Sequence, residues 1–366
     1  MNVFARIIAG VGGVVLVVAA LSSAVRTVVV PRAIGSWVTR FVFVSVRRIF
    51  DVVAHERRSF EARDRAFSFY SPVSLLLLPV AWVSLITLGF TAMFYASGVH
   101  SWREAFVVSG SSVFTLGFEV RRALPQLVLS FIEAGLGLGI IALLISYLPS
   151  IYAAFNRRET LVGMLEVRAG LPPSAAEMLV RYQRIGALDR IDKDLFPQWE
   201  VWFSDIEESH TSQPSLVFFR SPIKERNWII AAGCILDTAA IVASTLDRGP
   251  SPESALMLRT GFFALRRLAD YFDIEYDADP RPDDPISVTR REFDLLLVEL
   301  RAADIAVKAD LDQAWRDFVG WRVNYDRVLI VLAGFVGAPP ARWITDRTTG
   351  PRHRPRVGRR RIEGRL

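Results

Sequence analysis

Three long runs with almost no charged residues constrain the fold of this chain most strongly. They extend over residues 7–25, 68–99 and 124–152, and Glu133 is the sole charged residue in them. Each run is long enough for a helix that crosses a hydrocarbon core of about 30 Å. Because a spanning segment must satisfy its backbone polar groups internally, we predict an all-α integral membrane protein with three transmembrane helices.

The composition agrees with a membrane protein, since 51% of the 366 residues are hydrophobic. A cleaved signal peptide is the alternative for the first run, but that run exceeds the apolar core of about 7–15 residues found in such peptides. A single cysteine, Cys234, excludes an intramolecular disulfide, and with four histidines it leaves no Cys/His metal cluster. We therefore expect neither a metal site nor a cofactor.

Arginines predict the orientation in the membrane. Residues 31–66 contain eight arginines, and Arg157 and Arg158 follow the third run. By the positive-inside rule both regions are cytoplasmic. Residues 1–30 then span the inner membrane with the N-terminus on the outer side. The net charge is +6, and the arginines concentrate beside the apolar runs and at the C-terminus. They do not cover one folded domain, so nucleic acid is not an expected partner.

The connector of residues 31–66 has the pattern of a basic amphipathic helix. The pattern is carried by Trp37, Phe41, Val44 and Arg48, with the neighbouring Phe43, Val46, Ile49 and Phe50. Such a helix either lies on anionic lipid headgroups at the inner leaflet or is a solvated helix.

Residues 101–119, between the second and third runs, combine a short helix with a non-helical loop. Ser101 with Glu104 three positions later matches a capping box, and we expect the helix to end near Val113. The negative end of its dipole would then favour a desolvated cation inside the membrane. Non-helical backbone at that depth is tolerated only where it is buried in protein or lines a water-filled path.

The sequence Thr-Leu-Gly-Phe at 115–118 resembles the filter loop of potassium channels, Thr-Val-Gly-Tyr-Gly, and residues 67–158 resemble their two-span pore domain. The resemblance implies a homotetramer in which Thr115, Leu116, Gly117 and Phe118 coordinate a monovalent cation such as K⁺. Glu119 replaces the second filter glycine, which implies a divergent filter with a ring of carboxylates at its outer mouth. An outer loop with a surface helix is the alternative interpretation.

The third run contains small residues and one carboxylate. Gly135, Gly137, Gly139 and Pro149 resemble the hinge of a channel's inner helix, although small residues also permit close helix packing. A carboxylate within a membrane span is a functional hypothesis by default, and Glu133 is that residue here. A structural hydrogen bond from Glu133 to Ser109, Ser111 or Ser112 is the alternative.

Residues 159–346 predict a cytoplasmic bundle of six or seven helices, in which 228–246 is a buried helix and not a fourth span. Further helices are expected over 175–185, 197–208, 254–272, 289–307 and 311–335, with an extended segment over 211–222 and a loop over 277–285. Residues 347–366 contain eight arginines and predict a disordered basic tail.

These patterns predict a tetrameric cation channel of the inner membrane, regulated by its helical domain. The alternative is a non-conducting membrane anchor or signalling scaffold with a degenerate pore loop, which Glu119 would allow. We predict no enzymatic activity, because the chain contains no phosphate-binding loop, nucleotide fingerprint or paired histidines at metal spacing.

Overall fold

The computed structural model describes residues 3–30, 36–54 and 59–347. The regular secondary structure of this part of the chain is helical, apart from one isolated bridge between Leu246 and Val307. The chain divides into two compact units, Met1–Ala153 and Ala154–Leu366, beside the predicted boundary at residues 158 and 159. Of the predicted basic tail, residues 348–366 lie outside the described residues, as do residues 31–35 and 55–58 of the connector.

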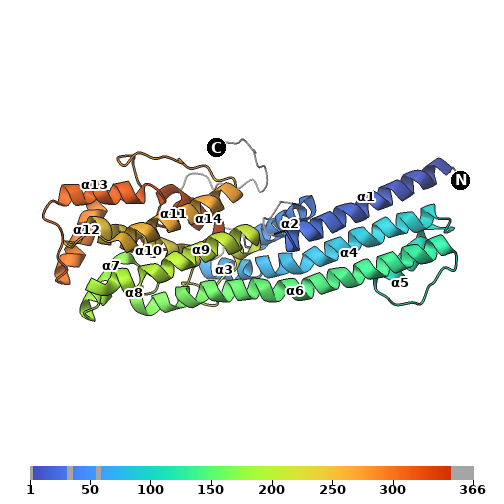
Figure 1. Ribbon diagram of the computed structural model, residues 1–366, viewed down its shortest axis with the longest axis horizontal. Coiled ribbons are helices and arrows are strands. Elements are labelled where there is room, and N and C mark those ends of the chain that lie inside the picture. The colour runs from blue at the N-terminus through green and yellow to red at the C-terminus, as the bar shows by residue number, and fades with distance from the viewer. Residues whose placement is uncertain (1–2, 31–35, 55–58, 348–366) are drawn as a thin grey trace. The chain divides into compact units, whose positions relative to one another are not determined.

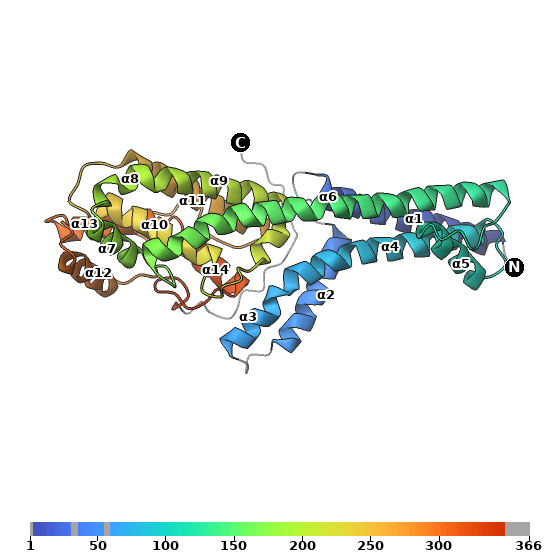
Figure 2. The same cartoon turned by 90° about the horizontal axis from the view of Figure 1, so that it is seen from below.

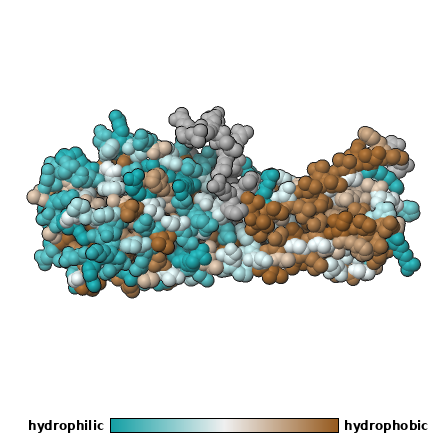
Figure 3. All heavy atoms as spheres, viewed as in Figure 1, coloured by the Kyte–Doolittle hydropathy of each residue, from teal (hydrophilic) through white to brown (hydrophobic). Residues whose placement is uncertain are grey.

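The N-terminal unit is built from long apolar helices that run side by side (Figures 1 and 2). Its elements are α1 (Val3–Val28), α2 (Trp37–Val53), α3 (Phe60–Ser68), α4 (Tyr70–Ala96), α5 (Trp102–Val113) and α6 (Leu124–Ala169), which continues into the second unit. Three helical stretches are long and apolar enough to cross a membrane, namely α1, Phe60–Ala96 and α6. The predicted number of spans is thereby confirmed at the level of length and composition, and Figure 3 shows the apolar surface over this unit.

Small residues bring α1 and α4 into close contact. A Cβ atom on Gly13 would lie 2.4 Å from the carbonyl oxygen of Gly89, and one on Gly89 would lie 2.7 Å from the carbonyl oxygen of Gly13. Farther along α1, the buried Ser23 hydroxyl accepts hydrogen bonds from Trp82 Nε1 at 2.9 Å and from Ser36 Oγ at 2.6 Å. Close backbone approach and buried hydrogen bonds are the usual means by which helices associate in lipid.

The C-terminal unit is a helical bundle around α10 (Trp228–Ser244), and almost all residues of α10 are buried. The prediction of a buried helix over residues 228–246 is thus confirmed. After α6 the other described α-helices are α7 (Ala175–Arg184), α8 (Ile191–Asp194), α9 (Phe196–Ser212), α11 (Pro252–Tyr271), α12 (Arg290–Ala302), α13 (Leu311–Arg322) and α14 (Asp326–Val336). Short 3₁₀ helices cover Leu188–Arg190 and Pro214–Phe218.

One buried charge on α10 connects it to the end of α13. Asp237 accepts hydrogen bonds from the guanidinium group of Arg322 and, at 2.8 Å, from the hydroxyl group of Tyr325. Arg322 also donates to Asp326 at 2.8 Å and to the carbonyl oxygen of Trp343 at 2.6 Å. Every charge in this network therefore has a partner, which is the condition under which ionised groups are tolerated in a core.

Three predicted elements of the bundle are wrong. The expected extended segment over residues 211–222 contains the end of α9 and a 3₁₀ helix. The expected helix over 289–307 ends at Ala302, because the following residues turn to pair with residues 245–247. The expected helix over 311–335 is two helices, because the Asn324 side chain caps the carbonyls of α13 and its own carbonyl accepts from Arg266 at 2.9 Å.

A buried histidine accepts a hydrogen bond from a buried arginine in the same unit. Arg158 Nη1 lies 3.1 Å from His210 Nε2, and His210 Nδ1 lies 2.9 Å from Ser209 Oγ. The Ser209 hydroxyl donates to the carbonyl oxygen of Asp205 at 2.5 Å, so it can only accept from His210. A neutral imidazole with its proton on Nδ1 satisfies all of these bonds, because the guanidinium group has no acceptor.

The contact between α1 and α4 can be tested with two adjacent glycines. Gly13→Ala places a methyl group against the Gly89 carbonyl and should lower the free energy of unfolding by about 1–3 kcal/mol. Gly12→Ala is the matched control, because a Cβ atom there meets nothing within 4 Å. The measurement is the thermal unfolding midpoint of the purified protein in detergent. Equal midpoints for the two variants would contradict the packing.

The buried histidine should make the stability depend on pH. Burial, and then the neighbouring charge of Arg158, lowers the pKa of His210 well below its usual 6.5. The unfolded chain therefore binds a proton that the folded chain does not, and stability should fall below pH 6.5 by up to about 1.4 kcal/mol per pH unit. Thermal unfolding of the wild type and of His210→Gln between pH 7.5 and 5 isolates this contribution, and identical pH profiles would refute it.

Candidate functional site

The helix α5 begins as the sequence predicts. The Ser101 hydroxyl accepts from the backbone N–H of Glu104 at 3.2 Å, and the ring of Trp102 stacks on Tyr95 with centroids 4.4 Å apart. Only one of the two capping-box bonds is formed, because the Glu104 carboxylate accepts from Arg121 at 2.8 Å instead. The first turn of α5 is thereby held to α4 on one side and to the returning loop on the other.

The end of α5 has an uncommon backbone conformation. The N–H of Leu116 donates to the carbonyl of Ser111 at 2.8 Å, and that of Thr115 donates to the carbonyl of Ser112 at 2.9 Å. This is a Schellman motif, in which the left-handed position is usually glycine. Here Thr115 occupies it with a φ of +55°. For a residue with a side chain this conformation costs roughly 1–2 kcal/mol, and such strain tends to be found at functional segments.

The loop that follows turns its amide groups toward α5. Glu119 N–H donates to the hydroxyl of Ser111 at 3.1 Å, and Gly117, with a φ of +71°, directs its N–H to the Ser111 carbonyl at 3.5 Å. Among the described residues, nothing donates to the carbonyl groups of residues 115–118. The side chains of Leu116 and Phe118 are 62% and 65% exposed. The loop thus presents free carbonyl groups and exposed apolar side chains.

Glu133 lies where α4, α5 and α6 meet, and it is fully buried. Its Oε1 is 2.5 Å from the hydroxyl oxygen of Ser109, which is 3.0 Å from the carbonyl oxygen of Thr87. Glu133 Oε2 has no hydrogen-bond partner among the described residues. The single Ser109 hydroxyl proton cannot serve both acceptors, so both contacts are hydrogen bonds only when a protonated Glu133 donates from Oε1 to Ser109 and Ser109 donates to Thr87.

The small residues predicted as a hinge occupy different environments. A Cβ atom on Gly137 would lie 2.1 Å from the carbonyl oxygen of Val113, so α6 packs directly on the end of α5. Cβ atoms on Gly135 and Gly139 would meet nothing within 4 Å. Pro149 lies inside α6, which is one helix from Leu124 to Ala169. Gly137 is therefore a packing position, and a gating hinge at these residues stays a prediction.

Two residues support the loop in roles that the sequence did not predict. Ser111 accepts hydrogen bonds from loop amides at both its carbonyl and its hydroxyl group. Arg121 lies 2.8 Å from Glu104 and 3.3 Å from Glu119, so it joins the start of α5 to the end of the loop. No local pattern identifies these roles, because each depends on how the loop folds back over α5.

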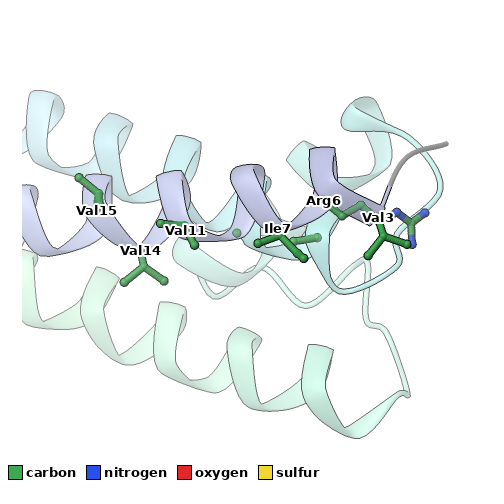
Figure 4. Close-up of a pocket in the computed structure, with 8 residues that line it drawn as sticks. Val3, Arg6, Ile7, Val11, Val14 and Val15 are labelled. Carbon is green, nitrogen blue, oxygen red and sulfur yellow. The ribbon is translucent and has the colours of Figure 1, made fainter.

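A second surface feature, a groove, lacks the converging polar groups of a catalytic site. An open groove of about 700 Å³ follows α1 and the end of α4 (Figure 4), and its charged lining residue is Arg6. The other lining residues are Val3, Ile7, Gly10, Val11, Val14, Val15 and Ala96. An enzyme pocket would bring several polar groups together, and this groove does not. Over residues 3–30, 36–54 and 59–347, no three His, Cys, Asp or Glu side chains gather as a metal site requires.

The packing of α6 on α5 can be tested within one helix. Gly137→Ala must displace the end of α5 and should lower the free energy of unfolding by about 1–3 kcal/mol. Gly135→Ala, one half-turn away, makes the same chemical change in open space and should leave the unfolding midpoint unchanged. A midpoint for Gly137→Ala equal to that of Gly135→Ala would contradict the close contact.

Comparisons of the chain with protein-family models, with curated proteins and with solved structures give no match.

Proposed function

We propose that four copies of the chain surround the loop of residues 115–119 and form a pore for monovalent cations such as K⁺. The observation that carries this proposal is the set of carbonyl groups at residues 115–118 to which no described residue donates. A cation gives up its water shell only where other oxygen atoms replace it, and backbone carbonyls do so in selectivity filters. Carbonyl groups left free at membrane depth would otherwise be costly.

The conformation of the loop supports the same function. In an extended strand, successive carbonyl groups point to opposite sides. Thr115 and Gly117, two positions apart, both have positive φ, which interrupts that alternation and favours carbonyls on one side. The loop also follows the C-terminal end of α5, where the helix dipole is negative.

Assembly into a tetramer is supported by what one copy lacks. A single loop supplies carbonyls on one side of an ion, and closed rotational symmetry supplies the others. The apolar side chains of Phe114, Leu116 and Phe118 are more than half exposed in one chain, and neighbouring copies would cover them. In this proposal the N-terminus is outside the inner membrane, and the C-terminal bundle lies in the cytoplasm and regulates opening through the continuous helix α6.

The outer end of the loop supports weak selectivity. Glu119 stands where a filter glycine is usual, and its carboxylate lies 3.3 Å from the Arg121 guanidinium group. In a fourfold ring these pairs would attract cations less than free carboxylates do. A carboxylate ring acts equally on K⁺ and Na⁺, and a glutamate resists the left-handed conformation that a filter glycine allows, so we expect little discrimination between the two ions.

A non-conducting anchor or scaffold is the second candidate. It is favoured by the same Glu119–Arg121 pair and by the Schellman hydrogen bonds of Thr115 and Leu116, which many helix ends use without binding an ion. In that case the loop closes α5 without binding ions, and the helical bundle alone carries the function.

Cation flux separates the two candidates. The full-length protein is reconstituted in liposomes, and K⁺ and Na⁺ fluxes are compared over a range of voltage and pH. Gly117→Val forces a branched side chain into positive φ and should reduce flux at least tenfold. Gly12→Val, at a position where a Cβ atom meets nothing within 4 Å and φ is not positive, should conduct like the wild type. Absent flux, or flux that Gly117→Val leaves unchanged, would favour the scaffold.

A further inference from the structure

The helix α2 has two different apolar faces. Val38, Val42 and Val46 are buried in the N-terminal unit, so they form the face that packs. Trp37 and Phe41 lie on the other face and are 60% and 66% exposed. The sequence predicted a basic amphipathic helix here, and the structure divides its apolar side chains between a packed face and an exposed face.

The exposed face continues along the whole helix. At intervals of three or four residues it contains, besides Trp37 and Phe41, the partly exposed Val44, the exposed Arg48 and Val52, with Arg40 at its edge. We call these six residues the outer face of α2. Large apolar side chains in this number are unusual on a helix face that meets only water.

Hydrogen bonds fix the start of α2 beside the end of α1. The hydroxyl groups of Thr27 and Thr39 lie 2.8 Å apart, and the Ser36 hydroxyl donates to that of Ser23 at 2.6 Å. Because α1 is a candidate span and these residues form its last turns, the outer face begins where the span leaves the hydrocarbon. Figure 2 shows that α2 and α3 then leave the direction of the long helices obliquely. Tryptophan is typical of this level of a membrane.

Two arginines on the outer face are not used inside the protein. Arg47 pairs with Asp51 at 3.2 Å and lies over the ring of Phe67 at 4.5 Å. Arg40 and Arg48, in contrast, have no ion-pair partner among the described residues. The outer face therefore combines exposed apolar side chains with free positive charge, which is the pattern of a helix on an anionic lipid surface.

We propose that the outer face of α2 lies on the anionic leaflet of the membrane that α1 and α4 cross, with its apolar side chains among the acyl chains and Arg40 and Arg48 at phosphate groups. We choose the membrane as the partner of this face because hydrogen bonds hold the start of α2 to the end of α1. The outer face therefore begins at the bilayer surface. The proposal depends on the spans and is independent of ion conduction.

Site-directed spin labels on the full-length protein in liposomes test the location. The native Cys234 is buried, and burial raises the pKa of its thiol, so introduced cysteines react selectively. Labels at Phe41→Cys and Val52→Cys are compared with Leu88→Cys, on the exposed side of α4, and Ser204→Cys, on the exposed side of α9. Accessibility to oxygen and to a water-soluble nickel chelate is measured at each position.

We expect an oxygen-to-nickel accessibility ratio at residues 41 and 52 at least threefold above that at residue 204 and closer to that at residue 88. A ratio like that of residue 204 would mean that the face is solvated and would overturn the proposal. Low accessibility to both reagents would mean that a second protein copy or another protein covers the face, and it would overturn the proposal as well.

The charge requirement is tested by lipid retention. Native mass spectrometry of protein released from phosphatidylcholine with phosphatidylglycerol should show weaker binding of phosphatidylglycerol to Arg40→Gln/Arg48→Gln. We expect roughly fivefold per arginine, which corresponds to about 1 kcal/mol. Arg259→Gln/Arg291→Gln removes the same charge from exposed positions of the C-terminal unit and should not change retention. An equal loss in both variants would overturn the role of α2.

Discussion

A peptide group that leaves a helix inside a bilayer must find its hydrogen-bond partner within the protein. The proposed pore places the loop after α5 under this constraint, and Ser111 meets it, because its carbonyl and hydroxyl groups together accept hydrogen bonds from the amides of Leu116, Gly117 and Glu119. The amide side of the loop is thus occupied and the carbonyl side is left free. This asymmetry gives the loop an electronegative side, and the proposed pore depends on it.

The two units are stabilised in different ways. In the N-terminal unit, glycines bring backbones together at two places, Gly13 against Gly89 and Gly137 against Val113. In lipid no hydrophobic force drives helices together, so close packing and buried hydrogen bonds must hold them. The C-terminal unit instead buries large aromatic side chains, among them Trp199, Phe203 and Trp228, around an apolar central helix.

Sequence reasoning succeeded where one local signal decides the structure. Uncharged runs identified the three long helices, and Ser101 identified the start of α5. It failed where distant contacts decide, as at Asn324, whose carbonyl is taken by Arg266 so that a continuous apolar pattern becomes two helices. For the same reason the roles of Ser111 and Arg121 were not predicted, because both contact residues that only the folded loop brings near.

The hydrogen bond between Ser23 and Trp82 bears on the order in which the native contacts can form. Its partner Trp82 is 59 residues farther along the chain, so α1 is synthesised well before α4 can contact it. During that interval the Gly13 surface lacks its native partner Gly89, whereas Ser36 of α2 is already available to Ser23. The native contacts of α1 are therefore completed only after α4 has been synthesised.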